Sequence, residues 1–94
     1  MNAEKELISQ LDKHIPQMEK AFKHLRLSEE GQAFRELYNL AVAYYEDARH
    51  FCRKKKYVQA FEALMISWAY VDAGLRLDVF ELLDDDLKAY FTIE

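Results

Sequence analysis

Two aspartates stand beside apolar positions in segments whose spacing is typical of helices. Asp47 comes three residues after Tyr44, and Asp72 comes four residues after Trp68. Residues three or four apart share one face of a helix, so each carboxylate is expected at the edge of a buried stripe. Two carboxylates partly removed from water are common components of an acid–base pair.

The same spacing also has a structural interpretation, which the sequence favours. Asp72 precedes Arg76 by four residues, which suits an ion pair along one helix. Asp47 is expected to bond a tyrosine hydroxyl or a basic group across to another helix, because buried charges are normally paired. The alternative is a small-ligand or enzymatic site between the second and third helices, formed by Tyr45, Asp47, Trp68, Asp72 and Arg76.

Other chemistry has little support. Asp47 and His50 give one carboxylate-x-x-His step, whereas a di-iron bundle needs two, and neither His14 nor His24 has an acid three residues before it. Cys52 and His50 are too far around a helix to form a dyad, so Cys52 is expected to be a buried thiol. No glycine-rich phosphate loop occurs, and we predict no metal, cofactor or catalytic residue.

Three apolar stripes must position these side chains. Each recurs at alternating steps of three and four residues, which is typical of a helix that buries one face. The stripes are Ile8, Leu11, Ile15, Met18, Phe22 and Leu25; then Phe34, Leu37, Ala41, Tyr44, Ala48 and Phe51; then Tyr57, Phe61, Leu64, Trp68, Val71 and Leu75. We predict one all-α domain over residues 1–94, an antiparallel three-helix bundle with helices at about 3–26, 29–54 and 57–82.

Four positions bear on the ends of these helices. Ser28 is expected to cap the second helix at its N-terminus. Pro16 predicts one kinked first helix, and the alternative is a helix that begins near Pro16. Gly74 either ends the third helix or lets a neighbour approach it, and the continuing period of Leu75, Val79 and Leu82 favours continuation. The apolar residues Leu87, Tyr90, Phe91 and Ile93 predict a short tail that packs on the bundle.

Composition limits the partners and the compartment. The 94 residues carry a formal net charge of −4, which disfavours broad binding to nucleic acid. The basic run from Arg53 to Lys56 is expected to offset the negative end of the second helix dipole. The apolar stretch from Ala63 to Val71 is too short to span a membrane. A single cysteine and an N-terminus without an apolar run predict a cytoplasmic protein.

Three motifs resemble a known family. They are Tyr-Tyr-x-Asp-Ala-x-x-Phe from Tyr44, Ala-Phe-Glu-Ala from Ala60 and Asp-Ala-Gly from Asp72. Their combination resembles the archaeal domain-of-unknown-function family 357, whose members look like compact three-helix bundles. The resemblance covers roughly residues 25–94 and implies a fold without an activity. Family members tend to have glycine near Lys55 and at Asp78, so the two helix ends at these positions are expected to differ.

The functional prediction rests on the aromatic surplus of the chain. Six Phe, six Tyr and one Trp exceed what so small a core needs, and aromatic side chains suit protein interfaces. The sequence therefore predicts a noncatalytic interaction or scaffold module that binds a protein partner or a second copy of itself through the second and third helices. A third hypothesis, binding of nucleic acid by the basic run, predicts strongly salt-dependent association.

Overall fold

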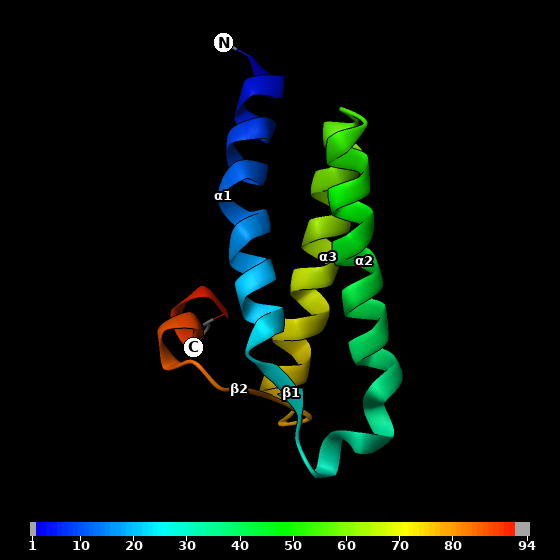
Figure 1. Cartoon of the computed structure of the whole chain (residues 1–94), viewed down its shortest axis with the longest axis vertical. Helices are drawn as coiled ribbons and strands as arrows, with labels where there is room; N and C mark the ends of the chain where they lie inside the picture. Colours follow the sequence, from blue (N-terminus) through cyan, green and yellow to red (C-terminus); the bar gives the residue numbers. More distant parts are fainter. Residues whose placement is uncertain (1, 92–94) are drawn as a thin grey trace.

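Three long helices dominate the computed structural model, which describes residues 2–91 (Figure 1). Helix α1 spans Ala3–Lys23, α2 spans Arg35–Arg53 and α3 spans Tyr57–Arg76. Successive helices run in opposite directions along the long axis of the molecule (Figure 1). The predicted all-α, antiparallel three-helix bundle is confirmed.

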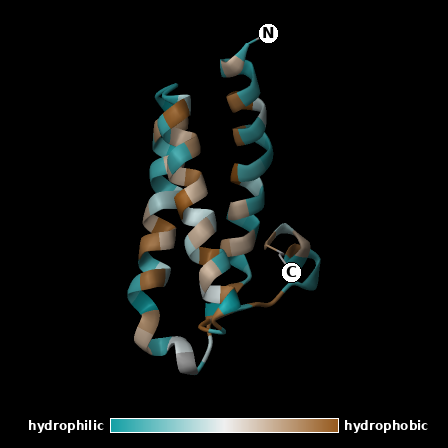
Figure 2. Ribbon diagram, turned by 180° about the vertical axis from the view of Figure 1, so that it is seen from behind, coloured by the Kyte–Doolittle hydropathy of each residue, from teal (hydrophilic) through white to brown (hydrophobic). Residues whose placement is uncertain are grey.

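Helix α1 is continuous across its proline. The Asn2 side chain accepts hydrogen bonds from the backbone N–H groups of Glu4 and Lys5, which satisfies two donors that the first turn leaves free. Pro16 lies inside the helix, so the alternative that the helix begins there is wrong. Figure 2 shows the hydrophobic residues of α1 along the side that faces the other two helices.

Small residues bring α2 and α3 close together. Ala41 and Ala48 of α2 and Ala60 of α3 are fully buried, and short side chains let two helix backbones approach. Ser67, also fully buried, donates a 2.7 Å hydrogen bond from its hydroxyl to the carbonyl oxygen of Ala41. This bond is a polar contact between the two helices that involves neither Asp47 nor Asp72.

Both α2 and α3 end in a Schellman motif whose left-handed residue is not glycine. At the end of α2, Lys55 has φ 61°, and the N–H of Lys56 donates to the carbonyl of Phe51 at 2.9 Å. At the end of α3, Asp78 has φ 60°, and the N–H of Val79 donates to the carbonyl of Gly74 at 3.0 Å. The chain thus makes a left-handed turn at both helix ends with a residue that carries a Cβ.

Two short strands correct the predicted helix boundaries. Strand β1 (Leu25–Leu27) follows α1, and β2 (Phe80–Leu82) follows α3, so the first and third helices are shorter than predicted. Continuation of the third helix beyond Gly74 to residue 82 is wrong, because Phe80 turns back and packs on Gly74. A Cβ at Gly74 would lie 2.1 Å from the Phe80 ring.

The start of the second helix also differs from the prediction. A 3-10 helix, η1 (Glu30–Phe34), precedes α2, which begins only at Arg35. The hydroxyl of Ser28 accepts the N–H of Gly31 at 3.0 Å, as an N-cap would, but it opens η1 rather than α2.

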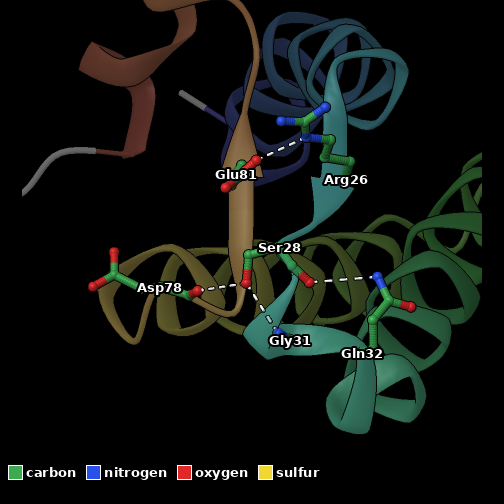
Figure 3. Close-up of polar contacts among 6 residues, drawn as sticks. All are labelled: Arg26, Ser28, Gly31, Gln32, Asp78 and Glu81. Atoms are coloured by element: carbon green, nitrogen blue, oxygen red, sulfur yellow. Dashed lines mark hydrogen bonds and ion pairs between the residues drawn. The ribbon is translucent and has the colours of Figure 1, made fainter.

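The strands and Ser28 form a clasp that joins the ends of α1 and α3 (Figure 3). The strands pair antiparallel, with Arg26 opposite Glu81, and these two side chains form an ion pair of 2.7 Å. The Ser28 hydroxyl donates to the carbonyl of Asp78 at 2.7 Å. Gly31 is required beside it, since a Cβ there would lie 2.0 Å from the carbonyl oxygen of Val79.

The C-terminal tail packs on the bundle as predicted. After β2 the chain forms a second 3-10 helix, η2 (Asp85–Phe91), which lies beside α1 (Figure 1). Leu87 and Phe91 are buried, and Phe91 stacks on Trp68 of α3 at 5.8 Å between ring centroids. Ile93, the last residue of the predicted tail, lies outside the described residues.

Candidate functional site

Tyr45 is the most deeply buried of the five predicted site residues. Its ring lies 5.3 Å from that of Phe22 in α1, and the guanidinium of Arg49 lies 5.8 Å from the Tyr45 ring centroid. The hydroxyl is enclosed and has no hydrogen-bond partner among the described residues. Burial raises the pKa of Tyr45, the negative charge of Glu19 raises it further, and the positive charge of Arg49 acts in the opposite direction. This phenol is therefore held protonated inside the bundle.

The two aspartates lie in different surroundings. Asp47 is exposed on α2, and its side chain has no hydrogen bond or ion pair with the residues that the structure describes. The side chain of Asp72 is 15% exposed, and its Oδ2 accepts a 3.1 Å hydrogen bond from Nε of Arg76. The predicted Asp72–Arg76 pair is present, whereas Asp47 does not reach across the bundle. Asp72 Oδ1 is enclosed and unpartnered within residues 2–91.

Trp68 belongs to a third environment, the contact between α3 and η2. Its ring is perpendicular to that of Tyr90, with 6.5 Å between centroids, and stacks on Phe91. The five predicted residues thus lie on two helices: Trp68, Asp72 and Arg76 follow one another at steps of four along α3, and Tyr45 and Asp47 belong to α2. Among them, the ion pair of Asp72 with Arg76 is the side-chain contact found within residues 2–91.

A polar cluster that the sequence did not reveal lies where η2 meets α1. His14 Nε2 lies 3.1 Å from Gln10 Oε1, and His14 Nδ1 lies 3.1 Å from Gln17 Oε1. The hydroxyl of Tyr90 is 3.2 Å from the same Nδ1, and the two rings stack at 5.7 Å. The roles of the two ring nitrogens depend on the tautomer. With the proton on Nε2, Nε2–H donates to Gln10 Oε1 and Nδ1 can accept the Tyr90 proton, whereas with the proton on Nδ1, Nδ1–H donates to Gln17 Oε1.

This cluster had only a partial signal in the sequence. Gln10 and Gln17 stand four residues before and three residues after His14, which places all three on one helix face. Tyr90 lies 76 residues further along the chain, and only the fold brings it to His14. Burial raises the pKa of Tyr90 to about 12.

The α2–α3 pair also has an apolar side that α1 does not cover. Tyr38 and Tyr45 contact Phe22 of α1, whereas Tyr44 contacts Tyr70 of α3, at 5.9 Å between ring centroids, on the opposite side of the pair. The helical period places further apolar side chains on that side. We call it the outer face; its residues are Leu37, Leu40, Tyr44, Ile66, Tyr70 and Leu77.

The outer face is well exposed for an apolar surface. Leu40 is 40%, Ile66 39% and Leu77 69% exposed, and Tyr44 and Tyr70 are half-buried between them. Asp47 follows Tyr44 by three residues and therefore stands at the rim of this face. Apolar side chains exposed on one side of a protein, with a charged residue at the rim, are typical of a protein-interaction surface.

Three further observations concern the described residues. Among residues 2–91, no group of three or more His, Cys, Asp or Glu side chains could hold a metal ion. No helix in that range is long and apolar enough to cross a membrane. The basic residues from Arg53 to Lys56 are exposed at the turn between α2 and α3.

Fold and surface together define a small helical bundle built on a tightly packed α2–α3 pair, with an apolar outer face. The sequence model of the family described as "Protein of unknown function (DUF357)" matches residues 13–80, and the chain belongs to this family. The matched range includes both helices of the pair and most of the clasp. No curated protein and no solved structure matches the chain.

Proposed function

We propose that this protein is a noncatalytic interaction module that forms a homodimer through the outer face of α2 and α3. The observation that carries the proposal is the exposure of Leu40, Ile66 and Leu77, which the helical period places on one side of the α2–α3 pair. Burial of such side chains stabilises an association by about 25 cal/mol for each Å² of apolar surface removed from water. The family is described as one of unknown function, so membership in it assigns no activity to the chain.

A second copy is the occupant that the shape of the face supports. Two antiparallel helices present a strip that can pack on itself about a two-fold axis, in which both copies use the same residues. An axis near Tyr44 and Ile66 would place the start of α2 in one copy beside the α2–α3 turn of the other. Glu36 would then lie toward the exposed cations Lys54 and Lys56, which is a favourable charge arrangement.

The test is a charge placed at the centre of the face. Ile66→Glu puts a carboxylate on the proposed axis, where it would lose its hydration opposite its own copy, so we expect the dimer dissociation constant to rise at least tenfold. Val58→Glu is the matched control, because Val58 is 56% exposed on the same helix but lies away from the outer face. Sedimentation equilibrium over a range of concentrations measures both variants, and circular dichroism checks that they fold.

Two results would contradict the proposal. One is a monomer of 11.2 kDa for the unmodified protein at every concentration measured. The other is a Val58→Glu variant that dissociates as readily as Ile66→Glu, which would place the interface elsewhere.

A further inference from the structure

An open hollow with a volume of about 430 Å³ lies where α1, α3 and η2 meet. Its walls are the rings of Phe61, Trp68 and Tyr90 and the thioether of Met65. A volume of this size falls within the range of small-molecule sites in proteins. The hollow lies on the side of α3 that faces η2, whereas the outer face lies on the side that Tyr44 contacts.

The aromatic walls are held in place before any ligand arrives. Buried Phe91 stacks on the Trp68 ring, with 21° between the two planes, and Trp68 is also one of the residues that line the hollow. Tyr90 stands perpendicular to Trp68 and is fixed from behind by its stack and hydrogen bond with His14. Rings that are already ordered lose little conformational entropy on binding, which favours affinity.

The lining also selects the charge of the ligand. No Asp, Glu, Lys or Arg side chain is among the residues that line this hollow. While the imidazole of His14, which also lines the hollow, is neutral, a charged ligand would lose hydration there without gaining an ion pair. An uncharged ring can instead pack against the aromatic side chains and the sulfur of Met65.

One polar group in the wall is placed to orient such a ring. With the proton of His14 on Nε2, Gln10 Oε1 accepts one hydrogen bond from it, at 3.1 Å between Nε2 and Oε1. A carbonyl oxygen has two lone pairs, so Gln10 retains the capacity to accept a second proton, from a ligand N–H or O–H. The hollow therefore combines three aromatic walls with one available acceptor.

From this arrangement we propose that the hollow is a binding site for a small, uncharged aromatic molecule that carries one hydrogen-bond donor, such as an indole or a phenol. The ring lies against Trp68, Tyr90 and Met65, and its donor points to Gln10. This site is independent of the proposed homodimer, since its residues and those of the outer face are on different sides of α3.

Indole is the probe, and Trp68 is the reporter. The chain has a single tryptophan, so its side-chain N–H gives one signal in a proton–nitrogen NMR spectrum. We expect indole to shift this signal in a saturable way, and benzoate, which carries a charge, to bind at least tenfold more weakly. A shift that does not saturate, or equal affinity for benzoate, would overturn the proposal.

Variants locate the site and test the hydrogen bond. Ala89→Leu adds bulk to the lining and should weaken indole binding at least tenfold, whereas Ala3→Leu, exposed at the far end of α1, should leave it unchanged.

Indole should bind more tightly than 1-methylindole, and Gln10→Leu should abolish that difference. Unchanged binding in folded Ala89→Leu, or a difference that survives Gln10→Leu, would place the ligand elsewhere. Ile66→Glu should bind indole normally, which separates a failure of this site from a failure of the dimer.

Discussion

Tyr90 connects three parts of the molecule through one side chain. Its ring contacts His14 of α1, Trp68 of α3 and its own neighbour Phe91. Burial raises its pKa from the usual 10.0 to about 12, because the phenolate would lose its hydration at this contact. The folded protein therefore retains the Tyr90 proton at a pH where an unfolded chain would lose it.

This shift predicts a loss of stability in alkali. A group whose pKa is higher in the folded state contributes stability that is complete below the unfolded value of 10.0 and is lost as the pH rises toward about 12. Absorbance titration of the tyrosines should show a component near pH 12, and Tyr90→Phe should remove it. Tyr45, the other tyrosine with a raised pKa, remains in that variant as an internal reference. An unchanged titration curve in Tyr90→Phe would contradict the assignment.

The sequence predicted contacts within a helix and missed those between helices. Asp72 and Arg76 are four residues apart, so their ion pair follows from helical geometry alone. The period also placed Asp47 beside an apolar stripe, but it does not tell whether that edge is buried or faces solvent. The contact of His14 with Tyr90 depends on how η2 folds back, which no local spacing encodes.

At the scale of the elements, the ends of α2 and α3 carry backbone strain. Lys55 occupies the left-handed conformation at φ 61° without the freedom that glycine has. A left-handed conformation costs a residue with a Cβ about 1–2 kcal/mol, and the gain from glycine is reduced because glycine is more flexible when unfolded.

Lys55→Gly should therefore stabilise the protein by about 0.5–1 kcal/mol. Asp78→Gly should give a smaller gain, since aspartate tolerates φ 60° better than lysine does. Urea unfolding measures both. Lys54→Gly is the control, because Lys54 has φ −92° and gains nothing from glycine, so that change should destabilise. Equal effects at Lys54 and Lys55 would show that charge, not conformation, is responsible.

The sequence located the three helices better than it located their ends. Alternating steps of three and four residues identify α1, α2 and α3, because that period is long and unbroken in each. Beyond Gly74 the apolar residues Val79 and Leu82 fit a helical period as well as a short strand. The strand forms because the Schellman turn at Asp78 redirects the chain toward Leu27, where Phe80 pairs with it. Strands of three residues are too short to give a sequence pattern from which a strand can be predicted.

At the scale of the whole molecule, packing is uneven along the bundle. Buried residues occur along the full length of α3, from Ala60 to Gly74, and in α2 from Ala41 to Ala48. In α1 the buried residues are Leu11, Met18 and Ala21, and the side chains of the first turn are exposed. The clasp holds α1 at its C-terminal end, far from the N-terminus (Figure 1).

This asymmetry predicts where the folded protein opens first. Amide hydrogens exchange through local opening, which needs less free energy where few apolar side chains are buried. We expect the amides of residues 7–10 in α1, which already have helical hydrogen bonds, to exchange at least tenfold faster than those of residues 18–21 in the same helix. Residues 63–71 of α3 should exchange most slowly, because buried side chains there face both neighbours. Hydrogen exchange followed by NMR measures each amide.

Ser28→Ala removes the hydroxyl that joins the clasp to Asp78, so it should speed exchange at residues 18–21 while α3 keeps its protection. Uniform protection along α1, or a Ser28→Ala effect confined to α3, would show that the clasp does not anchor this helix.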